Sequence, residues 1–190
     1  MRADFKVCLD ACVLVNIRLC DLLLRLAEKP RLFLPIWSDD ILKEVHRTHV
    51  NKLRWEVELA DSFQKEVRRF FPDALTDNYE YILPLLTNHP KDRHVLAAAI
   101  RAGSSLIVTF NLKDFPEEAL SKWNVEATHP QNYLLVLYEL DPNQIIQRVA
   151  KIAGQRDETQ LDTLVELGKS CPAFATRLID DLDLLNALVP

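Results

Sequence analysis

The chain alternates short apolar segments with longer segments of helical periodicity, and this alternation restricts it to few folds. Residues 5–9 and 106–110 are short and apolar, as buried strands are, and residues 32–34 and 125–128 are weaker strand candidates. Helical segments separate or follow these runs, over residues 13–28, 38–45, 52–70, 92–102 and 130–140. Strands that alternate with helices predict an α/β fold whose sheet has helices on both faces.

Three further helical segments follow residue 140. The first begins at Asp141-Pro142 and ends near Gly154, the second ends near Gly168, and the third runs from Pro172 to the end of the chain. We therefore predict two parts, an α/β domain over residues 1–138 and a helical C-terminal extension over residues 139–190. The length of 190 residues suits one domain with such an appendage.

Composition excludes several classes of protein. The three glycines form neither of the glycine-rich loops GxGxxG and GxxxxGK[ST], which excludes nucleotide binding by those loops. The four cysteines form no CxxC pair, which is typical of reduced cysteines in a cytoplasmic protein. Charged residues interrupt every long apolar run, so we expect no signal peptide, no transmembrane helix and no membrane partner.

The net charge of −5 is unevenly distributed along the chain. Residues 1–138 carry 18 basic and 19 acidic side chains, whereas residues 139–190 carry 5 and 9. Within the first part, Lys43, Arg47, Lys52 and Arg54 lie in a stretch where Glu44 is the one acid. This local positive charge could contact phosphates, or it could be an ordinary solvated helix face.

Four carboxylates stand at positions where α/β proteins bind ligands. Asp10 and Asp114 follow predicted strands, Asp92 begins the helix that leads into the second of these strands, and Glu44 lies early in its helix. Ligands of such sheets bind at the carboxyl ends of the strands, so these acids could converge there. Clustered carboxylates repel one another unless a cation lies among them, and Mg²⁺ or Mn²⁺ would suit oxygen ligands.

Each of these acids also has an ordinary structural interpretation. Asp10 and Asp92 could be helix N-caps, Glu44 could form an ion pair with Arg47, and Asp114 could be a turn residue. Taken separately, none of the four positions identifies a functional site.

Four segments resemble, in order, the acidic blocks of PIN-domain ribonucleases, in particular the VapC-like toxins of bacterial toxin–antitoxin pairs. Within residues 6–116 they are VCLDACVLVN with DLLLRLAE, LFLPIWSDDILKEVHR, HPKDRHVLAAAI and SSLIVTFNLKDFP. The resemblance implies a PIN-like three-layer sandwich with a short, mostly parallel sheet. It also implies a cytoplasmic endoribonuclease that depends on Mg²⁺ or Mn²⁺, forms a homodimer and is inhibited by a cognate antitoxin protein of a type II system.

Carried over residue by residue, the resemblance assigns Asp10, Glu44 and Asp92 as catalytic, metal-coordinating acids. In the fourth block, many members of the family have an acid where this chain has Asn111. We therefore expect Asp114 to be the fourth catalytic and metal-coordinating acid, with Asn111 as an auxiliary ligand or phosphate contact.

Smaller features of these blocks also bear on the site. Thr109 matches the family pattern and is expected to orient Asp10 or the scissile phosphate, whereas Cys12 stands where the family often has Asn. His89 and His94 bracket the third acid and could orient a metal ligand or contact the substrate. Lys43, Arg47, Lys52 and Arg54 are the candidate RNA contacts, and a homodimer would double that basic edge.

Other functions stay open at this point. A non-catalytic PIN-like module would bind RNA or another partner without cutting it, and a structure-specific DNA nuclease of the same superfold would cut a different substrate. A phosphatase with Asp10 as its nucleophile usually has a second acid two positions later, where this chain has Cys12.

Overall fold

The computed structural model describes residues 4–185, which form a five-stranded parallel sheet. The strands are β1 (Lys6–Leu9), β2 (Leu34–Ser38), β3 (Leu75–Thr76), β4 (Leu106–Val108) and β5 (Glu126–Thr128). Their order across the sheet is β3-β2-β1-β4-β5, and every pairing is parallel. The predicted α/β fold is thus confirmed, with a sheet that is parallel throughout.

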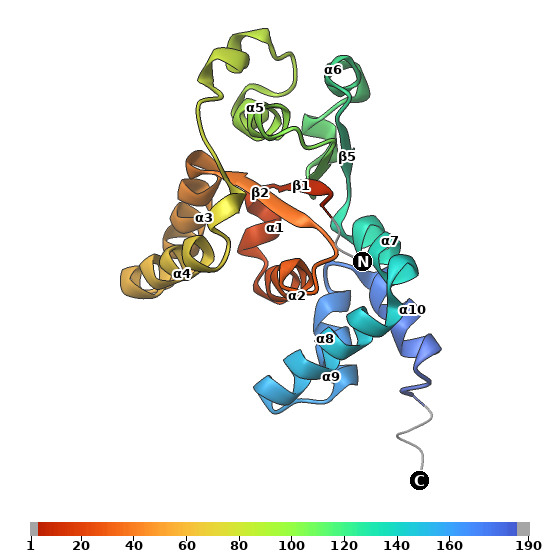
Figure 1. Cartoon of the computed structure of the whole chain (residues 1–190). Coiled ribbons are helices and arrows are strands. Elements are labelled where there is room, and N and C mark those ends of the chain that lie inside the picture. The colour runs from red at the N-terminus through yellow and green to blue at the C-terminus, as the bar shows by residue number, and fades with distance from the viewer. Residues whose placement is uncertain (1–3, 186–190) are drawn as a thin grey trace.

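Helices cover both faces of this sheet (Figure 1). Helix α5 (Arg93–Ala102) packs on one face, against β1, β2 and β4. Helices α1 (Ala11–Val15) and α2 (Ile17–Ala27) lie on the opposite face, while α3 (Asp39–Asn51) and α4 (Val57–Phe70) lie beside the β3 edge. The arrangement is the three-layer sandwich that the resemblance implies.

One part of the core lies where β1 and β4 meet α5. Ala97, Ala98 and Ala99 are fully buried, and their small side chains let the α5 backbone approach the sheet closely. Val7 and Ile107 are likewise fully buried, because a central parallel strand has helices on both faces. Gly103 then ends α5 in the left-handed conformation, with φ of +70°, as the sequence predicts.

Several of the predicted boundaries were wrong. The helix predicted over residues 52–70 begins only at Val57, and the strand predicted over residues 106–110 ends at Val108. The single helix predicted over residues 13–28 is divided into α1 and α2, because Asn16 leaves the helical conformation and its side chain caps α2 by accepting from the backbone N–H of Leu19. The strand predicted over residues 32–34 begins at Leu34 and continues to Ser38, whose hydroxyl also caps α3 by accepting from Ile41 N–H.

Short helices connect the remaining elements. They are η1 (Pro72–Ala74), η2 (Glu80–Leu85), η3 (Pro90–Asp92), η4 (Leu112–Asp114), α6 (Glu117–Leu120) and η5 (Ser121–Trp123). No helix of residues 4–185 has the length and apolar character needed to cross a membrane. Two of these connections, η3 and η4, shape the candidate site described below.

The C-terminal part is helical, as predicted. It follows α7 (Pro130–Leu140) with α8 (Pro142–Arg156), α9 (Gln160–Gly168) and α10 (Pro172–Asp181). Helix α8 packs against α2, and α10 packs against α7, so the extension continues the core of the α/β part. The predicted boundary at residues 138–139 falls in the last turn of α7. The last helix was predicted to run to the end of the chain but stops at Asp181, and residues 186–190 lie outside the described residues.

Candidate functional site

A cleft of about 930 Å³ opens beside the carboxyl ends of the central strands. Three segments that are distant in the sequence line it, namely α3, the η3–α5 segment with the residue before it, and the segment that contains η4. Their lining residues are Asp40, Lys43, Glu44, Arg47, His89, Lys91, Asp92, His94, Asn111, Lys113 and Asp114. The cleft therefore contains three of the four predicted acids.

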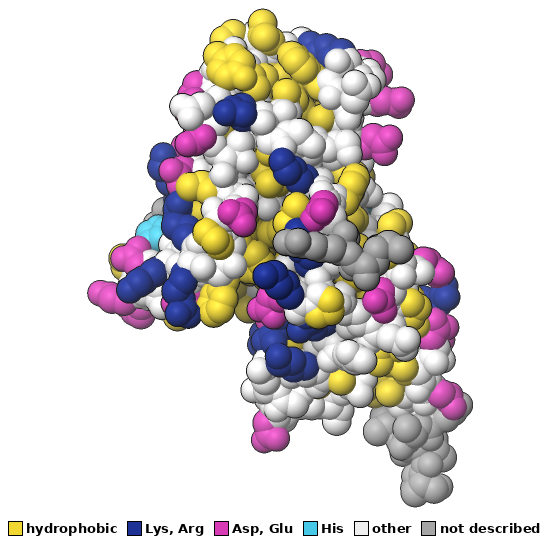
Figure 2. All heavy atoms as spheres, in the orientation of Figure 1, with side chains coloured by type: hydrophobic (Ala, Val, Ile, Leu, Met, Phe, Trp, Pro, Cys, Tyr) yellow, Lys and Arg dark blue, Asp and Glu magenta, His cyan; other side chains and the backbone are white. Residues whose placement is uncertain are grey.

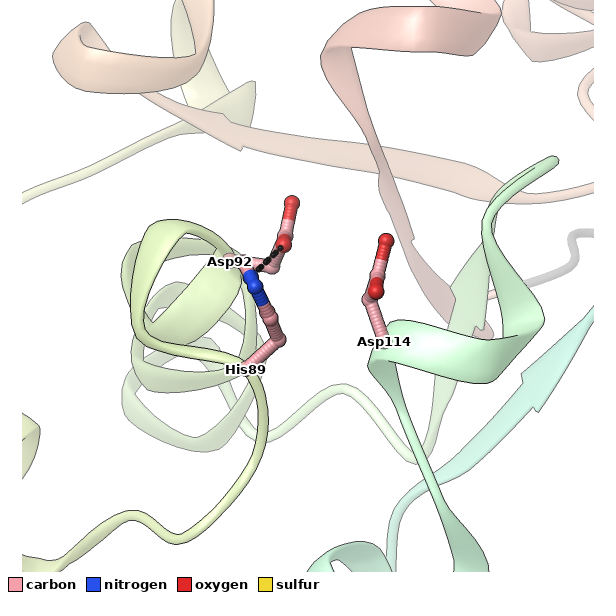
Figure 3. Close-up of side chains that lie close together, drawn as sticks. All are labelled: His89, Asp92 and Asp114. Atoms are coloured by element: carbon pink, nitrogen blue, oxygen red, sulfur yellow. Dashed lines mark hydrogen bonds and ion pairs between the residues drawn. The ribbon is translucent and has the colours of Figure 1, made fainter.

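Asp92 and Asp114 meet in this cleft, together with His89 (Figure 3). One ligand atom from each of the three side chains lies within 4.8 Å of the other two. The Nδ1 atom of His89 lies 3.1 Å from Oδ2 of Asp92. The segment that leads into α5 provides one imidazole and one carboxylate, and η4 provides the second carboxylate.

Asp10 lies deeper than the other acids, directly after β1. Its backbone N–H continues the pairing of β1 with β4 by donating to the carbonyl of Val108, and its side chain is almost completely buried. The carboxylate accepts hydrogen bonds from the hydroxyl of Thr109, at 2.6 Å, and from the thiol of Cys12, at 3.1 Å. Asp10 occupies the N-cap position of α1, as the structural interpretation had it, but its side chain makes no capping bond to that helix in the described chain.

Glu44 faces the cleft from α3. Its Oε2 atom lies 3.7 Å from Nε2 of His94, a nitrogen that is buried and has no hydrogen-bond partner among residues 4–185. Glu44 thus lies beside His94, and among residues 4–185 the structure gives no ion pair between Glu44 and Arg47. The carboxylate of Glu44 therefore lies across the cleft, outside the compact group of His89, Asp92 and Asp114.

The electrostatics of the group favour a cation. Burial raises the pKa of Asp92, and the negative charges of Asp10 and Asp114 raise it further, while the hydrogen bond from His89 opposes the shift. Like charges held this close in a partly buried site are costly unless a positive charge neutralises them. Carboxylate oxygens with one imidazole nitrogen form a donor set that a divalent ion fits.

Basic side chains line the same cleft. Lys43 and Arg47, two of the four candidate RNA contacts, are among them, and Lys43 also contacts Asp40 at 3.0 Å. Lys52 and Arg54, predicted to belong to the same basic edge, follow the end of α3 and lie outside the lining of the cleft.

Two further basic residues of the cleft, Lys91 and Lys113, were not predicted from the sequence. Each directly precedes a cleft acid in the sequence, Asp92 and Asp114 respectively, and that adjacency was the available signal.

The auxiliary residues lie in the loop that follows β4. Asn111 lines the cleft, and its backbone N–H donates to the Thr109 hydroxyl at 3.0 Å. That hydroxyl in turn donates to Asp10, so one small side chain connects the loop to the buried acid. Asp114 ends η4, and its backbone N–H bonds to the carbonyl of Asn111 at 2.9 Å.

A contact that was not predicted from the sequence stabilises the α3 side of the cleft. Tyr79 is buried, and its hydroxyl donates to Oδ2 of Asp40 at 2.6 Å. Burial and the neighbouring carboxylate raise the pKa of Tyr79 to about 12, so the hydroxyl keeps its proton at neutral pH. This bond holds the first turn of α3, and Lys43 and Glu44 extend into the cleft from the next turn.

Comparison with known proteins gives one informative relative. A protein of Mycobacterium tuberculosis named "Putative ribonuclease VapC50" is 37% identical over 113 residues, a match that covers 56% of this chain and 67% of that protein. No protein-family model matches the chain. No solved structure matches it significantly.

Proposed function

Since this chain belongs to the VapC-like family of PIN-domain ribonucleases, we propose that it is an endoribonuclease that hydrolyses RNA phosphodiester bonds with a divalent metal ion. One observation carries the proposal: Asp92 and Asp114 converge in a cleft whose remaining lining is rich in basic side chains. The acids suit a metal ion, and the basic side chains suit the phosphates of a nucleic acid.

The proposed catalytic, metal-coordinating set is Asp10, Glu44, Asp92 and Asp114, with Mg²⁺ or Mn²⁺ as the ion. Asp92 and Asp114 would hold it most directly, because their carboxylates lie closest together. Asp10 lies near enough to raise the pKa of Asp92, and Glu44 faces the cleft from the other side. When bound, such an ion polarises a phosphodiester and activates water for attack.

The other side chains of the cleft would bind and orient the substrate. Lys43, Arg47, Lys91 and Lys113 supply positive charge for the phosphates flanking the scissile bond. Asn111 offers an amide to the ion or to a phosphate, and Thr109 holds Asp10 in place. Lys52 and Arg54 would contact RNA outside the cleft. This local field lets a chain of net charge −5 bind a polyanion.

A cleavage assay tests the proposal. The metal-free protein is given RNA substrates of varied structure with Mg²⁺, with Mn²⁺ or with chelator, and matched DNA substrates run in parallel. We expect RNA cleavage that requires the ion, is lost in Asp92→Asn and is kept in Asp180→Asn, a matched change on the exposed surface of α10.

Three results of this assay would contradict the proposal. RNA that binds but is never cut would indicate a non-catalytic module. Cleavage of DNA alone would indicate a DNA nuclease. Cleavage that Asp92→Asn retains would exclude the proposed acids.

We also propose that the chain is the toxin of a bacterial type II pair, acts in the cytoplasm and is held inactive by a cognate antitoxin protein. The relative's name supports this, together with a cleft that another protein could cover. We expect expression of the parent to stop growth and expression of Asp92→Asn to be tolerated. Equal toxicity of the two proteins would show that catalysis by these acids is not the cause.

The proposed assembly is a homodimer. On the face drawn in Figure 2, apolar side chains gather over the segment between β3 and α5, where Tyr81 and Leu85 of η2 are exposed. A second copy that covered this surface would remove it from water. Light scattering on the parent and on Tyr81→Glu tests the arrangement, and a parent of monomer mass would contradict it.

A further inference from the structure

His89 is built into the acid site by its backbone as well as its side chain. Its N–H donates to the carbonyl of Asp114 at 3.2 Å, and its carbonyl accepts from the N–H of Asp92 at 2.9 Å. Its ring nitrogen Nδ1 lies 3.1 Å from Oδ2 of Asp92 (Figure 3). Both acids of the compact group are therefore tied to this one residue.

The local sequence fixes this position. Because Pro90 follows, the backbone of His89 is extended, with φ of −52° and ψ of 129°, and Pro90 starts η3 at once. The chain thus turns directly after His89, within η3, and the ring of His89 lies against the carboxylate three residues later. The side chain is 46% exposed, so an ion can reach the ring without local unfolding.

The spacing of the donor atoms suits a shared ion. Neighbouring ligands of an octahedral ion with bonds of about 2.1 Å lie about 3 Å apart. The 3.1 Å between Nδ1 of His89 and Oδ2 of Asp92 is close to that spacing. Either the ring donates a proton to the carboxylate, or the neutral ring and the carboxylate both bind a cation.

We propose that His89 supplies a nitrogen ligand to the ion that Asp92 and Asp114 hold, and that the site consequently prefers Mn²⁺ to Mg²⁺. The inference rests on the proposed metal-dependent function and adds a non-acidic ligand to it. Imidazole nitrogen is a good ligand for transition ions, whereas Mg²⁺ selects oxygen and water. Replacing a carboxylate by a neutral ring also lowers the negative charge that the ion must neutralise.

Pulsed electron paramagnetic resonance on the full chain with Mn²⁺ bound tests the ligand directly, without RNA. We expect nitrogen coupling in the parent, its loss in His89→Gln and its retention in His94→Gln. His94 is the matched control because its ring also lines the cleft, next to Glu44. Calorimetric titration should show Mn²⁺ binding weakened about tenfold or more in His89→Gln, with a smaller effect on Mg²⁺.

His89→Asp keeps the test decisive if glutamine disturbs the loop. It returns an oxygen ligand, so we expect binding to persist, nitrogen coupling to vanish and the preference for Mn²⁺ to decrease. Bound Mn²⁺ without nitrogen coupling in the parent, or coupling that survives in His89→Gln, would overturn the inference and leave the proposed metal-dependent function standing. A parent that binds no Mn²⁺ would overturn both.

Discussion

The hydroxyl of Thr109 offers the sharpest test of how the site is held together. Thr109 is fully buried, and its hydroxyl donates to Asp10 at 2.6 Å while accepting from the N–H of Asn111 at 3.0 Å. Valine has nearly the same shape and lacks the hydroxyl. Thr109→Val therefore removes the hydrogen bond to the buried carboxylate, leaves the Asn111 N–H without this acceptor, and keeps the packing almost unchanged.

The size of the effect follows from two losses and one gain. The hydrogen bond to a charged group contributes about 1.5–3 kcal/mol and the bond from the Asn111 N–H about 0.5–1.5 kcal/mol, whereas the methyl group that valine buries instead returns about 0.8 kcal/mol. We expect Thr109→Val to lower the free energy of unfolding of the metal-free protein by about 1–4 kcal/mol. For a chain of this length that corresponds to a decrease in Tm of roughly 2–16 °C.

Thermal unfolding in chelator and RNA cleavage with Mn²⁺ measure the two consequences. Cleavage should decrease about 10–100-fold, because partners that orient metal-binding groups have effects of that size. Thr163→Val is the matched control, since the buried Thr163 hydroxyl donates to Glu158 at 2.9 Å, outside the cleft. The control should lose stability without losing cleavage. If Thr109→Val melted and cleaved like the parent, the inferred role of this hydroxyl would be wrong.

Three further outcomes are expected. Gly103→Ala should lower the free energy of unfolding in urea by about 1–2 kcal/mol, because φ there is +70°. Burial against aromatic rings, and secondarily the charge of His46, lower the pKa of His49. The unfolded chain therefore binds more protons than the folded protein, and the free energy of unfolding should decrease as the pH falls through 6.5. His49→Phe should reduce this dependence of Tm on pH in thermal melts. The raised pKa of Asp92 means that the folded protein binds more protons than the unfolded chain, so metal-free stability should decrease as the pH rises above the ordinary carboxyl range. Asp92→Asn should consequently have a higher Tm than the parent in chelator at neutral pH, and an equal Tm would contradict repulsion among the acids.

Most of the fold could be predicted because its signals are local. The apolar run that became β4, the left-handed Gly103 and the Pro130–Leu140 helix all follow from residues close in sequence. Strand β3 was missed because two residues carry no detectable pattern, and its pairing with β2 is a tertiary contact. The break at Asn16 was missed because leucine periodicity continues across it.

The candidate acids could be named from the sequence, whereas their geometry could not. Resemblance gave Asp10, Glu44, Asp92 and Asp114, but residue patterns alone left each acid with a structural alternative. The structure places these acids differently. Asp10 is buried and hydrogen-bonded to Thr109, Asp92 and Asp114 lie close together in the cleft, and Glu44 faces them from the other side of it. These positions depend on how α3, the segment that leads into α5 and the segment that contains η4 pack beside the sheet, and no local sequence pattern determines that packing.

By itself, the sequence determined the α/β class, the helical extension and the residues that can carry chemistry, because periodicity, caps and acid spacing are properties of neighbouring residues. Only the tertiary structure decided which of those residues share a space. It brought His89, Lys91 and Lys113 to the acids and left Lys52 and Arg54 outside the cleft. The physical reason is the parallel sheet, whose crossovers place the ends of distant strands at one edge, so side chains far apart in the chain meet there.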